Sequence, residues 1–151
     1  MPALLVEHFY EMSSSERAKG IARAWTMAEF PSRILEPRYW TSMWEQSVEE
    51  DEFIDGDGAV HNHCELPSTL TLWRGALPEF SFGMSWSIDR ERATWFARRF
   101  DNANRENIKG ALYEITVPSS LILGRFDERG ESEFVVDLMQ LNDDDVTEVT
   151  F

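Results

Sequence analysis

Helical and strand-like patterns occupy separate parts of this sequence, and this segregation is its strongest constraint on the fold. Residues 1–50 carry the 3.6-residue periodicity of amphipathic helices. Ser13 and Glu16 have the spacing of a capping box, which predicts a helix that begins there and ends before Pro31. A second helix is expected from Pro37. Its aromatic stripe is typical of a buried helix face and consists of Tyr39, Trp40, Met43 and Trp44.

The rest of the chain has strand-like texture. Residues 51–68 are crowded with Asp, Glu and Gly, which predicts an acidic loop. Residues 69–151 are rich in strand patterns, interrupted by one helix that Asp89 can cap. Because helices and strands are segregated rather than alternating, we predict an α+β fold with a single domain over residues 1–151. In it, a helical N-terminal part packs on a split, mostly antiparallel sheet.

Composition and charge exclude several classes of protein. The formal net charge of −14 repels phosphates and disfavours nucleic-acid binding. Cys64 is the only cysteine, so no internal disulfide can form, which fits a reducing compartment. No apolar run approaches the roughly 20 residues that cross a bilayer, and the N-terminus lacks the features of a signal peptide. We therefore expect a cytoplasmic protein without membrane contact, located in the host cytoplasm if it is viral.

The acidic segment and the histidines do not form a familiar metal or hydrolase motif. Aligning the run at 55–58 with a calcium loop places Phe53 and Cys64 at the first and last ligand positions, where the pattern fails. His61, His63 and Cys64 could hold zinc, but no second cluster supplies the other ligands at a usual spacing. A Gly-x-Ser-x-Gly motif is also absent. We predict no metal site.

Three segments of the second half carry candidate chemistry, and the first centres on Arg74. Leu70, Leu72 and Arg74 share strand parity, which sends the arginine to the same side as core leucines. An inward guanidinium requires an anion. If Arg74 were considered alone, a structural salt bridge at a strand end would be the better explanation.

The other two segments pair hydroxyls and carboxylates. Ser85 and Ser87 lie on one face of a short strand that leads into the helix capped by Asp89. Glu131 and Glu133 lie on one side at the start of an apolar strand. Like charges two residues apart on a strand face are unfavourable, so these carboxylates are either solvated or used in function.

In the order Arg, Ser-x-Ser, Glu-x-Glu, these segments resemble the arginine–serine–glutamate class of ADP-ribosyltransferases. The class includes cholera-like and clostridial toxins, vertebrate ecto-enzymes and many phage proteins. The resemblance covers about residues 69 to 137. It implies an ADP-ribosyltransferase-like sheet and a mono-ADP-ribosyltransferase that transfers ADP-ribose from the substrate NAD to a protein acceptor, with arginine as the expected target.

The resemblance also implies a role for each matched residue. Arg74 would bind the NAD phosphates, and Ser85 would match the first serine of the family, which holds the catalytic glutamate and the nicotinamide-side ribose. Glu133 would be the invariant catalytic glutamate. Glu131 would occupy the first position of the pair, where glutamate is usual in arginine modifiers. The expected NAD-binding set is completed by Gly75, Ser87 and Phe96.

The acceptor side of the expected site is assigned in the same way. The segment 124–130 would be the loop that meets the acceptor, with Phe126 as its aromatic contact. Three other functions remain open at this point. One is an NAD glycohydrolase, in which water is the acceptor, and another is a non-catalytic acidic interaction protein that mimics nucleic acid. The third is a transferase-like fold that has lost catalysis and only binds, although the presence of Arg74, Ser85 and Glu133 argues against it.

Overall fold

The computed structural model describes residues 2–28, 31, 35–99, 109–127 and 132–151. The described residues of the N-terminal part form the helices α1 (Pro2–His8), α2 (Ser14–Met27) and α4 (Pro37–Glu45). The capping box predicted at the start of α2 is present, because the Ser13 hydroxyl and the Glu16 carboxylate each accept a bond from the other residue's backbone N–H. The predicted helices are confirmed. None of the helices in the described residues is long and apolar enough to cross a membrane.

Eight strands in the described residues are joined into one sheet, in the order β2-β1-β6-β7-β4-β3-β5-β8. Most neighbouring strands are antiparallel, while β1 and β6 are parallel, so the sheet is mixed. The predicted α+β class is confirmed. The strands are β1 (Glu52–Asp55), β2 (Val60–Asn62), β3 (Thr69–Ala76), β4 (Ser85–Ser87), β5 (Ala111–Pro118), β6 (Ile122–Phe126), β7 (Glu133–Val136) and β8 (Thr147–Val149).

Short 3-10 helices connect several of these elements. They are η1 (Phe9–Glu11), η2 (His63–Glu65), η3 (Pro78–Phe80), η4 (Ser119–Leu121), η6 (Leu138–Gln140) and η7 (Asp143–Asp145). A further α-helix, α5 (Arg90–Arg98), begins after Asp89, whose side chain accepts hydrogen bonds from the backbone N–H groups of Glu91 and Arg92. The predicted cap of this helix is therefore confirmed.

The prediction of an acidic loop over residues 51–68 is wrong, because β1 and β2 form a hairpin there. Phe53 and Ile54 are fully buried, so this highly charged stretch still contains a core strand. The Asp55 carboxylate accepts hydrogen bonds from the backbone N–H groups of Asp57 and Ala59. These bonds stabilise the turn between the two strands. Gly58 completes the turn at φ +80°, a conformation that favours glycine.

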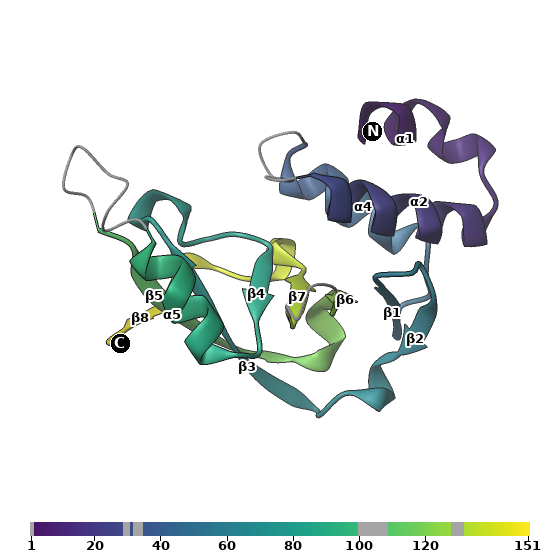
Figure 1. Cartoon of the computed structure of the whole chain (residues 1–151). Helices are drawn as coiled ribbons and strands as arrows, with labels where there is room; N and C mark the ends of the chain where they lie inside the picture. Colours follow the sequence, from purple (N-terminus) through teal and green to yellow (C-terminus); the bar gives the residue numbers. More distant parts are fainter. Residues whose placement is uncertain (1, 29–30, 32–34, 100–108, 128–131) are drawn as a thin grey trace.

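The sheet is covered by two hydrophobic clusters that use alternate residues of the same strands. On β7, Val135 packs into a cluster with the N-terminal helices, whereas Phe134 and Val136 pack into the other. The first cluster contains Trp25, Trp40 and other residues of both halves of the chain. The helical part and the strand-rich part therefore share one core, and Figure 1 shows α1, α2 and α4 at the β1–β2 end of the sheet.

Helix α5 packs closely on β3 through small residues. Ala93 and Ala97 are buried, and a Cβ at position 75 would lie 1.9 Å from the carbonyl oxygen of Ala93 and 2.5 Å from the backbone nitrogen of Ala97. Both neighbours are backbone atoms that cannot move aside. Gly75 is therefore required for the close approach of α5 to the sheet.

We expect Gly58→Ala to lower the free energy of unfolding by about 1–3 kcal/mol, because its backbone is left-handed and a Cβ would lie 2.6 Å from Lys19 Cα. Urea unfolding measures the change. Gly20→Ala is the matched control, since alanine favours the helix and the nearest atoms, Leu5 Cδ1 at 2.9 Å and Met12 Sδ at 3.9 Å, belong to side chains rather than to backbone. Equal destabilisation by both substitutions would contradict the assigned turn.

Candidate active site

The strand order brings the three candidate segments side by side. Strand β4 lies between β3 and β7, so the strands that carry Arg74, Ser85 and Glu133 are neighbours in the sheet. Ser85 is in register with Val135, and Ser87 is in register with Glu133. Paired residues of neighbouring strands extend to the same face, so the hydroxyls of β4 and the carboxylate of Glu133 are on one side.

The carboxylate of Glu133 is held by donors from two distant parts of the chain. The Ser85 hydroxyl donates a short hydrogen bond to Glu133 Oε2. The indole Nε1 of Trp25, on α2, donates to Glu133 Oε1 at 3.1 Å. A different element therefore contacts each oxygen of the carboxylate.

Arg74 lies against the connection between β3 and β4. Its Nε donates to the carbonyl oxygen of Phe80 at 3.0 Å, and its Nη1 donates to the carbonyl oxygen of Ser85 at 2.8 Å. Its guanidinium rests on Gly83, where a Cβ would lie 2.4 Å from Nη2. Burial lowers the pKa of Arg74 to about 10, and the negative charge of Glu133 opposes that shift. Arg74 is therefore a cation at neutral pH.

Ser87 and Gly75 occupy positions that local structure accounts for. The Ser87 hydroxyl accepts a hydrogen bond from the backbone N–H of Asp89 at 3.0 Å, just before α5 begins. Gly75 faces α5, as described above. The structure thus places both residues beside the candidate site and gives each a packing or turn role.

Phe96 is placed on α5, where it is half-buried. Its ring meets the Trp95 ring edge to face, with centroids 5.1 Å apart, and the guanidinium groups of Arg92 and Arg99 lie over it. These contacts are with residues of the same helix and its C-terminal cap. Within the described part of the chain they do not join Phe96 to Glu133.

The two expected acceptor-side residues have different outcomes. Glu131 lies outside the described residues. The expectation of Phe126 as a loop contact for the acceptor is wrong, because Phe126 belongs to β6, is 4% exposed and stacks on Trp25. The apolar ring completes the core between α2 and the sheet, which buries it away from any acceptor.

The sequence did not reveal the contact between Trp25 and Glu133. Helical periodicity correctly places Trp25 on the buried face of α2, where its side chain is 4% exposed. However, the two residues are 108 positions apart, and no local pattern indicates which polar atom a buried indole N–H will meet. The usual need of a buried tryptophan N–H for a partner is the only available signal.

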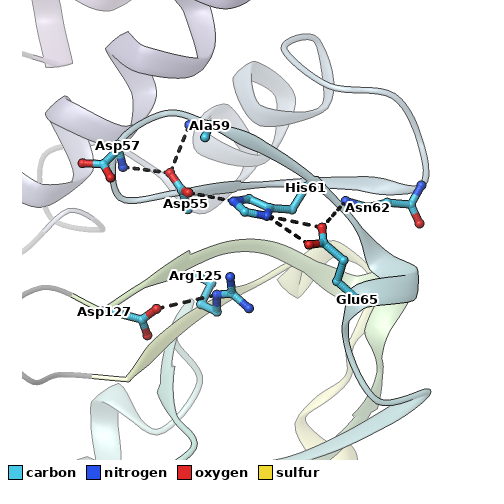
Figure 2. A network of polar contacts seen from close by, with 8 residues as sticks. All are labelled: Asp55, Asp57, Ala59, His61, Asn62, Glu65, Arg125 and Asp127. Atoms are coloured by element: carbon cyan, nitrogen blue, oxygen red, sulfur yellow. Dashed lines mark hydrogen bonds and ion pairs between the residues drawn. The ribbon is translucent and has the colours of Figure 1, made fainter.

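A second polar cluster surrounds His61 on the β1–β2 hairpin (Figure 2). His61 Nε2 lies 2.7 Å from Asp55 Oδ2, and Nδ1 lies 3.3 Å from Glu65 Oε2. The His61 ring is stacked on Phe53, with centroids 5.2 Å apart, and the guanidinium of Arg125 lies over the same Phe53 ring. The hydrogen bond to Asp55 raises the pKa of His61.

The residues considered for zinc are used in other ways. His61 is paired with carboxylates. His63 Nε2 forms a hydrogen bond of 2.8 Å with the carbonyl oxygen of Ile122. Cys64 is exposed. Among the described residues, no group of three or more His, Cys, Asp or Glu side chains is arranged to hold a metal ion.

A surface hollow lies elsewhere on the molecule. It has a volume of about 500 Å³ and lies between the start of α2, the end of α4 and the β1–β2 turn, where Lys19, Gln46 and Glu49 line it. It shares no lining residue with the group formed by Arg74, Ser85 and Glu133. The candidate site is therefore defined by its hydrogen bonds and charges.

Comparisons with known protein families, with curated proteins and with solved structures gave no significant match. The geometry of Arg74, Ser85 and Glu133 is consequently the basis for any functional conclusion.

The pH dependence of stability tests the pairing of His61. Because its pKa is raised on folding, the stabilisation is complete below the ordinary histidine pKa and is lost as the pH rises through the higher folded value. Between about pH 6 and pH 8 we expect the stability advantage of wild type over His61→Gln to shrink by roughly 0.5 kcal/mol.

Urea unfolding at several pH values measures this change. Asp55→Asn is a suitable control, since it retains an acceptor for the turn while removing the charge that pairs with His61. The Asp55→Asn substitution should also reduce the pH dependence of the free energy of unfolding. The same slope in wild type and both variants would contradict the role of this pair.

Proposed function

We propose that this chain is a mono-ADP-ribosyltransferase that transfers ADP-ribose from NAD to a protein acceptor, with arginine as the target. The observation that carries the proposal is the bond from the Ser85 hydroxyl to the Glu133 carboxylate, with the cation Arg74 beside the same strand. In the arginine–serine–glutamate class of ADP-ribosyltransferases, which this chain resembles, a serine holds the catalytic glutamate in this way. The neighbouring order of β3, β4 and β7 supports an ADP-ribosyltransferase-like arrangement of the sheet.

The proposed chemistry breaks the bond between nicotinamide and the ribose C1′. The electron pair leaves with nicotinamide, and positive charge develops on the ribose in an oxocarbenium-like transition state. The negative charge of Glu133 stabilises this cation, and its carboxylate accepts a hydrogen bond from a ribose hydroxyl. The acceptor nitrogen then bonds to C1′ and loses a proton.

Arg74 would neutralise the pyrophosphate of NAD. Its pKa of about 10 keeps it charged at neutral pH, and its two bonds to backbone carbonyls fix the guanidinium plane. These bonds use Nε and Nη1. Other N–H groups of a guanidinium can bond to phosphate oxygens in the same plane.

Glu133→Gln tests the mechanism directly. It preserves the shape of the side chain but removes the charge that meets the oxocarbenium ion, so nicotinamide release should fall by at least about 100-fold. Glu148→Gln on the exposed strand β8 is the control and should retain wild-type activity. Undiminished nicotinamide release from a folded Glu133→Gln variant would refute this role.

Glu131→Ala separates a transferase from a glycohydrolase. If Glu131 orients the acceptor guanidinium, the variant should lose labelling of the protein target and retain slow hydrolysis of NAD. Target labelling and nicotinamide release are measured side by side. A parallel loss of both signals in a folded variant would contradict this role of Glu131. Wild type that releases nicotinamide without labelling a target would indicate that water is the natural acceptor, and absence of both signals from wild type would favour a non-catalytic acidic binder.

A further inference from the structure

We infer that Trp25, on the N-terminal helix α2, is a positioning residue for Glu133, so that the helical part completes the active site. The inference rests on the proposed function. It assigns to the first fifty residues a role in catalysis beyond their contribution to the core. The observation that supports the inference is the hydrogen bond of 3.1 Å from Trp25 Nε1 to Glu133 Oε1.

The direction of the Trp25 N–H is fixed by the rings that surround it. Its indole meets the rings of Trp40 and Trp44 edge to face, with centroids 5.2 and 5.5 Å away, and stacks on Phe126 at 6.4 Å. Phe126 is in register with Glu133 across the β6–β7 pair. The platform that orients the indole is thus the strand neighbour of the residue that accepts its hydrogen bond.

The contact is selective within this cluster of tryptophans. Trp40 donates to the backbone carbonyl of Pro31, and in the described part of the chain Trp44 Nε1 has no hydrogen-bond partner. Only Trp25 directs its N–H to the candidate catalytic carboxylate within this cluster. Burial of Trp44 without a partner shows that packing alone can hold an indole in this core.

Two donors on separate oxygens fix the carboxylate plane and favour its charged form. Ser85 contacts Oε2, and Trp25 contacts Oε1. A carboxylate has about four acceptor positions, so bonds to a ribose hydroxyl remain possible. A hydrogen bond to the charged form stabilises that form. Loss of the Trp25 donor should therefore weaken Glu133 as an anion without removing it.

Trp25→Phe tests the inference, with Trp44→Phe as the matched control. Both variants replace a buried indole of the same cluster, but only the first deletes a donor to Glu133. For Trp25→Phe we expect kcat for nicotinamide release to fall about tenfold, with little change in KM for NAD. In the pH profile of kcat, the acid limb of this variant should shift to higher pH by roughly half a unit or more, because the lost donor had stabilised the charged form of Glu133. Trp44→Phe keeps an aromatic ring against Trp25 and deletes no donor to Glu133, so it should move that limb less. Equal shifts in both variants would overturn the inference.

An NMR measurement tests the contact without enzymatic activity or a core substitution. The indole N–H signal of Trp25, identified by its loss in Trp25→Phe, should shift in Glu133→Gln, whereas the Trp44 signal should shift less. A Trp25 signal that does not respond to Glu133→Gln would overturn the inference alone. Absence of nicotinamide release from wild type would instead overturn the proposed function, so the two failures are distinguishable.

Discussion

The rest of the candidate site depends on how the negative charge of Glu133 is accommodated. Its half-buried carboxylate loses contacts with water, and such a charge is costly unless donors replace that water. The Ser85 hydroxyl on β4 and the Trp25 indole on α2 both donate to it, so donors come from both halves of the chain. The carboxylate therefore has its observed surroundings only when the N-terminal helix is docked on the sheet.

Apolar packing determines the direction of this polar contact. Trp25 cannot rotate freely because Trp40, Trp44 and Phe126 surround its ring, and its side chain is 4% exposed. Residues in well-packed cores occupy defined rotamers, so a donor on such a ring is held in a fixed direction. The cluster that stabilises the junction between helices and sheet thereby also orients a group at the candidate site.

Local patterns in the sequence predicted much of the fold and part of the site. A capping box predicts α2, the Asp89 cap predicts α5, and helical periodicity supports both, because these signals involve residues only two to four positions apart. The hairpin of β1 and β2 was missed because acidic residues surround Phe53 and Ile54, and the burial of these two residues depends on contacts elsewhere in the chain. For the same reason, the sequence places Trp25 in the core but does not identify its partner, which lies 108 residues away.

Arg74 is a cation that the fold already holds largely out of water. Its guanidinium lies against Gly83, and backbone carbonyls of Phe80 and Ser85 accept two of its N–H groups. The lowered pKa, about 10, reflects the water that the cation has already lost. The negative charge of Glu133 raises the pKa of Arg74 and so offsets only part of the lowering caused by burial. An anionic group that reaches Arg74 would thus gain electrostatic attraction without having to desolvate the cation fully, which is the condition under which a fixed charge binds phosphate most effectively.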